Sequence, residues 1–307
     1  MALDNLTVLT AYRSGLTLQE VAAKIGVSHM TVWRTLRKHD ITIRRQGPRS
    51  LPAGITIEYT DEHFVWVMVT PDLVNPVDSS TRGWLANTVR AIAGNRRHLV
   101  TWSDEPREIA ERIVAHKLGK SGCLAQARTC RIAPVSKAEA DHFYTAHHLQ
   151  GKCNGDVTLG LYGASPDRLV AAMTFADASV CRGPVNTMVL QRFATDQSVP
   201  GAASRLLKAF SQQYDGPIVS YSDNRYSDGS LYRTLGFNLT AHYRPDYRYR
   251  LNGVWIAKNR CQRRHLAAKL SIPLETAPSE RVMADRLGLR RHYDLGKLTW
   301  TLSNHLR

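Results

Sequence analysis

The sequence predicts a mixed α/β protein of the α+β type, and three observations lead to this fold class. Two short helical patterns lie in the first fifty residues, strand-like runs and amphipathic helices share the middle, and strands alternate with helices in the C-terminal half. These patterns divide the chain into residues 1–50, 51–130 and 131–307. We predict a helical N-terminal domain, a small α/β middle region and a C-terminal mixed sheet with helices.

The composition favours a nucleic-acid partner. The 307 residues include 41 lysines and arginines against 26 acids, a formal charge of +15, which is typical of proteins that neutralise phosphates. A basic protein with no specific polyanion is the alternative. No run approaches the roughly 18 apolar residues of a membrane span, the N-terminus lacks a secretory pattern, and the five cysteines form no CxxC pair. We therefore expect reduced thiols and a bacterial host cytoplasm.

The N-terminal domain shows the pattern of two helices joined by a tight turn, after a first packing helix over residues 5–13. Gly26 lies where the turn needs a positive φ, Ala22 leaves room for the second helix to cross, and Ser28 is placed to cap that helix. The apolar spacing fits two short helices better than one long helix, with core positions at Val21, Ile25, Val27, Val32 and Leu36.

These residues resemble the helix-turn-helix of resolvases, invertases and many phage regulators. The resemblance implies that the second helix enters the major groove of double-stranded DNA, and that the basic segment after it follows phosphates or enters a minor groove. A three-helix bundle without DNA contact is the alternative. The residues predicted to contact DNA are Ser28, His29, Trp33, Arg34, Arg37, Arg44 and Arg45.

The middle region predicts a hairpin from the runs ITIEY and FVWVMV, then a helix, a strand HLVTW and a second helix. The stretch from RRHLVTW to ARTCRI resembles the join between a Vsr-type nuclease domain and the C-terminal part of Hef-like homing endonucleases. Such a nuclease needs clustered carboxylates and a divalent metal. Asp72 could begin a cluster, but no Asp/Glu-x-Lys follows it as far as Lys120. We expect these carboxylates to be solvated and not to bind metal: Glu58, Asp61, Glu62, Asp72, Asp104 and Glu105.

The C-terminal half contains a strand, a small-residue turn and a helix in succession, which would place free N–H groups at a helix N-terminus, where a pyrophosphate can bind. These segments, with the later LYRTLGF, resemble the GNAT acyltransferases. The resemblance implies acetyl-CoA or another acyl donor, and a thiolate protonated by Tyr232. Pro200 departs from the usual glycine-rich loop. The predicted cofactor-binding residues are Val199, Gly201, Ala202, Ala203 and Ser204.

Three stretches of this half, VLQRFATDQSVPGAASRLLKAF, SYSDNRYSDGSLYRTLGF and HHLQG, are more similar to a GNAT-like subgroup shared by phage Mom DNA-modification proteins and Hef-like endonucleases. The predicted catalytic residues are Ser222, Asp223, Arg225 and Tyr232. Asp223 would accept a proton from an attacking amine, and Arg225 would hold an anionic group. Two alternatives are open, because Tyr232 suits a core position and Asp223 could cap a helix over residues 227–235.

Two further groups of residues could bind a ligand. His147, His148 and Cys153 suggest metal ligands, but adjacent histidines do not easily face one site and no fourth ligand is evident, so we predict no metal. Residues 242–265 predict a hairpin that turns at Asn252-Gly253, and its interleaved aromatic and basic residues, among them Arg248 and Arg250, suit a phosphate backbone and an unstacked base. A basic, solvated edge hairpin is the alternative.

The sequence therefore predicts a phage or mobile-element protein that brings a GNAT-like domain to DNA for acyl-type modification of a flipped base. The first alternative is a site-specific homing endonuclease with a divalent metal in residues 55–120. The second is a DNA-binding regulator without catalytic activity.

Overall fold

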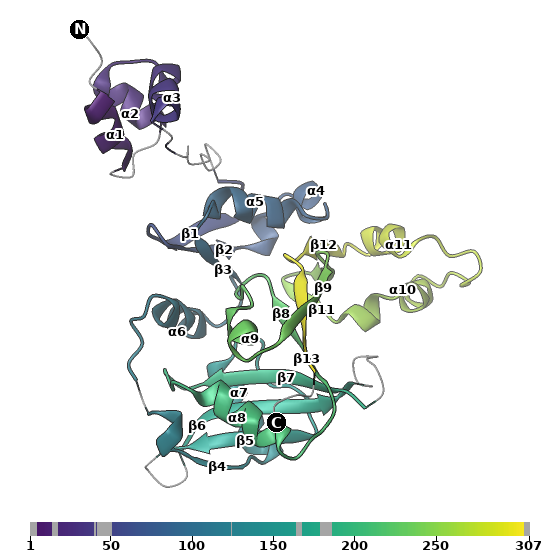
Figure 1. Ribbon diagram of the computed structural model, residues 1–307. Helices are drawn as coiled ribbons and strands as arrows, with labels where there is room; N and C mark the ends of the chain where they lie inside the picture. Colours follow the sequence, from purple (N-terminus) through teal and green to yellow (C-terminus); the bar gives the residue numbers. More distant parts are fainter. Residues whose placement is uncertain are drawn as a thin grey trace. The chain divides into compact units, whose positions relative to one another are not determined.

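The computed structural model describes residues 5–13, 18–39, 41, 51–123, 125–163, 168–178 and 186–303. The chain divides into two compact units, the first formed by residues 1–51 with 88–95 and the second by residues 52–87 with 96–307. The predicted fold class is confirmed, because helices accompany both parallel and antiparallel strand pairs (Figure 1).

Three helices make up the N-terminal part of the first unit: α1 (Asn5–Arg13), α2 (Leu18–Ile25) and α3 (His29–Lys38). Val8, Val21, Val32 and Leu36 are completely buried between them. The turn works as the sequence predicts, since Gly26 has a φ of +75° and the Ser28 side chain accepts the Thr31 N–H at the start of α3.

The second unit begins with a three-stranded sheet. The predicted hairpin is present as an antiparallel pair, and the third strand runs parallel to the second. The strands are β1 (Ile55–Thr60), β2 (Phe64–Val69) and β3 (Arg97–Trp102). The helices of this region are η1 (Pro71–Leu73), α4 (Pro76–Ser79) and α6 (Arg107–Lys117), together with α5 (Trp84–Ala93), whose residues from Thr88 onward belong to the first unit. Phe64, Trp66 and Leu99 pack against Ile109 and Val114 of α6, so the helix covers a face of this sheet.

A seven-stranded sheet forms the largest part of the unit (Figure 1). In spatial order its strands are β4 (Arg131–Pro134), β5 (Val157–Tyr162), β6 (Leu169–Asp177), β7 (Met188–Thr195), β8 (Ile218–Asp223), β13 (Lys297–Leu302) and β9 (Asn238–Tyr243). Every neighbouring pair is antiparallel except β7 and β8, which are parallel. A parallel pair needs a crossover, and α8 (Ala202–Ser211) provides it.

The two faces of this sheet are covered by different helices. Leu206 and Phe210 of α8 pack on one face, where α9 (Ser230–Thr234) contributes Tyr232. Phe143 and Tyr144 of α7 (Lys137–His147) pack on the opposite face. A short 3-10 helix, η2 (Ala127–Thr129), precedes β4 and packs with the start of α8.

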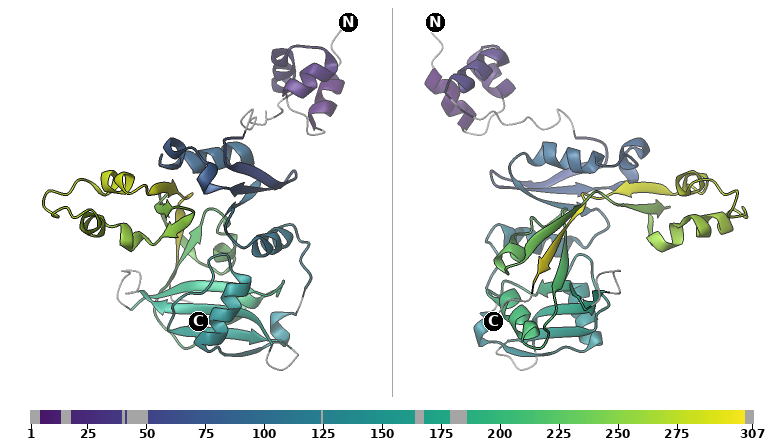
Figure 2. Two further views of the ribbon diagram at one scale, coloured as in Figure 1. Left: turned by 180° about the vertical axis from the view of Figure 1, so that it is seen from behind. Right: turned by 45° about the vertical axis from the view of Figure 1, so that its right-hand side comes forward.

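A third sheet carries a two-helix arm, which we define as residues 257–289. Its strands are β11 (Val254–Ile256), β10 (Tyr247–Leu251) and β12 (Arg290–Tyr293). The turn at Asn252-Gly253 is confirmed, with φ values of 47° and 78°. The predicted hairpin to residue 265 was too long, because η4 (Lys258–Cys261) and α10 (Arg263–Lys269) replace its second half. Leu266 and Ala267 of α10 pack with Met283 and Ala284 of α11 (Glu280–Arg286), and Figure 2 shows the two helices side by side.

Candidate functional site

The parallel strands β7 and β8 separate partway along their length. Residues 188–190 pair with residues 218–220, and beyond them the described strands make no further pairs with each other. Side chains alternate along a strand, so Ser220 and Ser222 lie on the α8 face while Tyr221 and Asp223 lie on the other. The separation leaves room for a ligand between the two strands.

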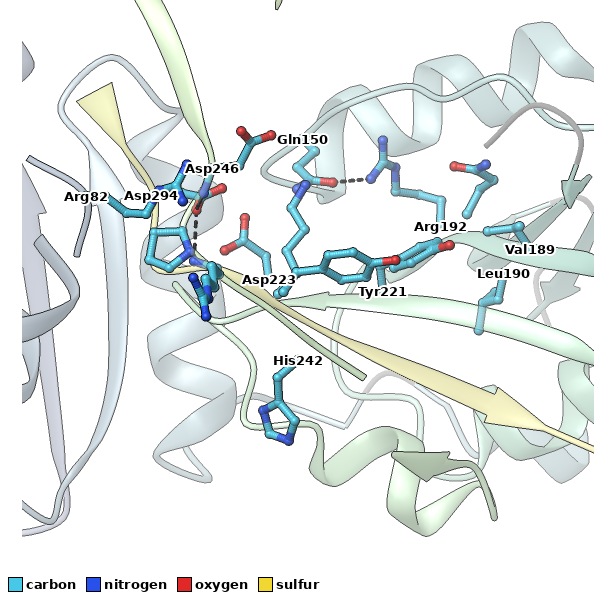
Figure 3. A pocket seen from close by; sticks show the side chains of 16 residues that line it. Arg82, Gln150, Val189, Leu190, Arg192, Tyr221, Asp223, His242, Asp246 and Asp294 are labelled. Atoms are coloured by element: carbon cyan, nitrogen blue, oxygen red, sulfur yellow. Dashed lines mark hydrogen bonds between the residues drawn. The ribbon is translucent and has the colours of Figure 1, made fainter. Parts of the chain in front are cut away.

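A cavity of about 800 Å³ lies at this separation. Figure 3 shows side chains entering it from several parts of the second unit that are distant in sequence. Tyr221 and Asp223 come from β8, Arg192 from β7 and Lys297 from β13, and Arg82 comes from the region before β3. A volume of this size lies within the range typical of small-molecule sites.

In the cavity lining, cationic side chains outnumber the carboxylates that have no cationic partner. Asp223 and Asp246 already have cationic partners, Arg225 and Lys258. Burial alone would raise the pKa of Asp246, but the Lys258 ammonium and a backbone N–H bring it below its usual value. The cations in the lining are Arg82, Arg192, Arg244 and Lys297. The cavity therefore suits a ligand that carries negative charge.

Asp294 is the carboxylate in the cavity whose proton affinity is increased. Burial raises its pKa and the charge of Asp223 raises it further, despite two hydrogen bonds that its Oδ1 accepts, at 2.8 Å each, from the N–H groups of Asp246 and Gly296. Gly296 has a φ of +82°, and a Cβ there would lie 2.4 Å from the Tyr243 carbonyl oxygen. Such a carboxylate suits a general base. Our sequence reasoning missed Asp294, although the Asp-x-Gly-Lys stretch before the last strand was a usable signal.

Two tyrosines line the cavity beside these charges. The rings of Tyr221 and Tyr243 have centroids 6.3 Å apart and planes inclined by 55°, and their exposed fractions are 36% and 57%. Exposed aromatic rings beside cations suit a planar, unstacked base next to a phosphate.

The predicted catalytic residues divide between three surroundings, and only Asp223 lines the cavity. Its carboxylate accepts hydrogen bonds from the Arg225 N–H (2.9 Å) and Nε (3.2 Å). It does not cap a helix, because α9 begins only after Gly229. Arg225 is buried and also binds Glu105 at 2.9 Å, so the prediction that it holds a substrate anion was wrong.

Ser222 and Tyr232 lie on the α8 face of the sheet. Ser222 accepts a hydrogen bond from the Trp300 indole at 2.9 Å, so it does not enter the cavity as predicted. Tyr232 stacks on Trp300, and its hydroxyl lies 3.0 Å from that of Ser220, which donates to the Leu190 carbonyl. Burial raises the Tyr232 pKa. This packing fits the alternative that Tyr232 is a core residue. The Tyr232 hydroxyl nevertheless lies close to the separation of β7 and β8.

The predicted cofactor loop has both bound and open N–H groups. Ser198 and Ala202 donate to Gly122 and Val199, and the Pro200 carbonyl accepts from Ala127. The N–H groups of Gly201, Ala203 and Ser204 bond no described residue. Val199, Ala202 and Ala203 bury their side chains in the core, whereas Gly201 and Ser204 are exposed. Three open donors at the start of a ten-residue helix fit an anionic diphosphate, with Pro200 removing one donor that a glycine would supply.

Three carboxylates of the middle region bind buried arginines. We call Arg225 and Arg250, together with their carboxylate partners, the arginine seam. Arg250 binds Asp72 (3.1 Å) and Asp104 (2.7 Å), and Arg225 binds Glu105 and Asp223. Only 7% of the Arg250 side chain is exposed, so its predicted contact with DNA was wrong. The expectation that Asp72, Asp104 and Glu105 are merely solvated was also wrong. Arg248 is exposed and lies over the Trp255 ring at 4.7 Å.

The histidines and the cysteine that suggested metal ligands point to different partners. His147 contacts Arg112 and lies 3.7 Å from Asp196, while His148 accepts the Gln150 N–H. Burial lowers the His148 pKa to about 3 and raises that of Cys153. Among the described residues, no group of three or more His, Cys, Asp or Glu residues could hold a metal ion.

The predicted DNA contacts of the first unit lie on or before α3. His29, Arg34 and Arg37 are exposed, and the Arg37 guanidinium lies over the half-buried Trp33 ring at 5.3 Å. Ser28 is exposed but its side chain is used as the helix cap. The predicted contacts Arg44 and Arg45 lie outside the described residues. Within the described chain, no helix is long and apolar enough to cross a membrane.

Solved structures that are similar to this chain include two acetyltransferases. The ribosomal-protein-S18-alanine N-acetyltransferase from Escherichia coli has 12% identity and a TM-score of 0.33, and the match covers 58% of this chain and 96% of that one. An acetyltransferase from Bacillus subtilis in complex with CoA has 12% identity and a TM-score of 0.30, covering 57% and 98%. No protein-family model matches the sequence, and no curated protein sequence matches it significantly. The mixed α/β class rests on the strand order described above.

Proposed function

We propose that this protein is a DNA-modifying transferase, in which a GNAT-like domain transfers an acyl-type group to an exocyclic amine of a DNA base. The cavity at the separation of β7 and β8 is the observation that carries this proposal. It combines exposed tyrosine rings, four cations and a carboxylate with a raised pKa, which are the groups needed to receive a flipped base, its phosphate and an amine proton.

Within the cavity we assign a role to each class of side chain. Tyr221 and Tyr243 stack against the base, and Arg244 and Lys297 hold the neighbouring phosphates. Asp294 takes the proton that the amine loses as it forms its new bond. Asp223, which we predicted as the proton acceptor, has a supporting role in this proposal. Two hydrogen bonds from Arg225 fix its orientation, and its negative charge raises the Asp294 pKa.

The donor would bind on the α8 face of the sheet. When bound, acyl-CoA supplies an activated acyl group as a thioester. The open N–H groups of Gly201, Ala203 and Ser204 would hold its diphosphate, and the Tyr232 hydroxyl lies near the strand separation, where it can give a proton to a leaving group. Transfer would take place between β7 and β8, where their pairing ends.

The first unit would deliver the domain to duplex DNA. Arg34 and Arg37 of α3 are exposed, the turn and the cap match those of a helix-turn-helix, and the net charge of +15 favours a polyanion. Its origin in a phage or mobile element is part of the same proposal. The metal-dependent nuclease is not proposed, because Asp72, Asp104 and Glu105 are bonded to arginines and do not form an open cluster.

The test is mass spectrometry of nucleosides from DNA exposed to the protein in cells. We expect one nucleoside with an added mass for the wild type, and a rate lowered by about 10²- to 10⁴-fold for Asp294→Asn, which keeps the hydrogen-bond acceptor but cannot take the proton. Glu108→Gln, at an exposed carboxylate of α6, is the matched control and should modify DNA normally. Unaltered nucleosides with a defined footprint would contradict the transferase and support a regulator.

A further inference from the structure

The two-helix arm presents exposed cations that have no carboxylate partner in the described part of the chain. Residues 257–289 contain seven lysines and arginines against three acids. Lys258 binds Asp246, and Arg263 donates to the carbonyls of Ala277 and Pro278. Five other exposed cations form no ion pair with any described residue: Arg260, Arg264, Lys269, Arg281 and Arg286.

The arm has a core that packs its two helices together. Cys261, Leu266, Met283 and Ala284 are completely or almost completely buried. Glu280, one of the three acids, is turned inward, since it accepts hydrogen bonds from Tyr247 (2.6 Å) and Tyr249 (3.2 Å). Helix α10 contains no acid at all. Its outer side is therefore positive without internal compensation.

The sheet that carries the arm begins at the rim of the cavity. Pro245 and Asp246 line the cavity immediately before β10, and Asp294 lines it immediately after β12. The five residues of β10 span about 17 Å at roughly 3.3 Å per residue. That length corresponds to about five base pairs of a duplex, at roughly 3.4 Å per base pair. A duplex with one base in the cavity can thus continue over the arm.

We propose that the arm is a second contact to the phosphates of duplex DNA, separate from α3. This inference rests on the proposed function for the position of the DNA, and it moves the C-terminal DNA contact from the buried Arg250 to the arm helices. The arm reads no base sequence, because long, exposed side chains that reach phosphates position a duplex without specifying it.

The test is the salt dependence of binding to a fluorescent 30-base-pair duplex. Each phosphate contact contributes about 0.9 to the slope of log K against log salt. Arg264→Gln with Lys269→Gln should make the slope shallower by about 1.8, the sum of two such contacts. The matched control is Arg128→Gln with Lys208→Gln, which removes the same charge from exposed positions of η2 and α8 and should leave the slope unchanged.

An unchanged slope for the arm variant, or an equal change in the control, would overturn the proposal. A smaller slope on heparin or an RNA hairpin, but not on duplex DNA, would assign the arm to another polyanion and overturn it as well. Nucleosides are analysed after exposure to the same proteins. If the wild type leaves them unmodified while the arm variant still loses slope, the transferase fails and the arm contact stands.

Discussion

The cavity and the arginine seam are built from the same residue types and use them in opposite ways. In the seam, Arg225 and Arg250 are almost fully buried and each binds two carboxylates. In the cavity, Arg244 and Lys297 line an open space, and Asp294 holds a raised pKa. The difference shows that an arginine can bind a ligand only where the carboxylates of its own chain do not already bind it.

The largest expected effect tests the structural role of the seam. Arg225→Ala leaves Glu105 and Asp223 buried without their cation, so we expect the free energy of unfolding to fall by about 3–5 kcal/mol. Chemical denaturation measures this. Arg107→Ala, at an exposed arginine that binds Glu58 and Glu111, is the comparison and should lower the free energy of unfolding far less, because solvent screens exposed ion pairs. If the two variants lost the same free energy of unfolding, the buried ion pairs of the seam would contribute no more to stability than exposed ones.

The next effect concerns His292, which lies beside the seam between Trp102 and Trp255. Burial and the nearby Arg290 and Arg250 lower its pKa from 6.5 to about 4. Because the folded pKa is depressed, the stability it contributes is present above pH 6.5 and is lost as the pH falls toward about 4.

His292→Phe should therefore reduce the loss of stability over this pH range by about 3 kcal/mol, which is the free energy of a pKa shift of this size. The substitution leaves no polar atom stranded, since the buried Nε2 of His292 bonds no described residue. Denaturation at several pH values checks it. A pH dependence identical to that of the wild type would mean that His292 is solvated in solution.

The smallest effect tests the cavity. Transfer should require the Asp294 carboxylate, so the rate should fall as the pH drops through its raised pKa. Removing the negative charge of Asp223 with Asp223→Asn should lower the Asp294 pKa and move this acid limb to lower pH. Initial rates across a pH series measure the shift, with thermal denaturation as a check on folding. A limb that moves to higher pH, or does not move, would exclude Asp294 as the base.

Local pattern predicted much of the fold. The turn at Gly26, the Ser28 cap, the hairpin of β1 and β2 and the helix after β7 all depend on residues close together in the chain, whose periodicity and turn chemistry are visible in the sequence. The arm helix α10 was missed, because its basic residues resembled those of the preceding strand and concealed the apolar pair Leu266 and Ala267.

The site was less predictable, because its charges are assigned by contacts between distant residues. Asp223 was found from its polar stretch, but its Arg225 partner looked equally available in the sequence. The bonds that withdraw Arg250 from DNA come from Asp72 and Asp104, which precede it by 178 and 146 positions. Asp294 lies far along the chain from β8, and only the pairing of β13 with β8 brings it to the cavity.

The 178 positions between Asp72 and Arg250 also affect the order in which the chain folds during synthesis. A ribosome adding about 5 to 20 residues per second needs roughly 9 to 36 seconds to proceed from Asp72 to Arg250. Throughout that interval the middle sheet has its carboxylates but not the arginine that will neutralise two of them. The seam is therefore a late step of folding, and the cavity is completed later still, when Lys297 and the final strand have been synthesised.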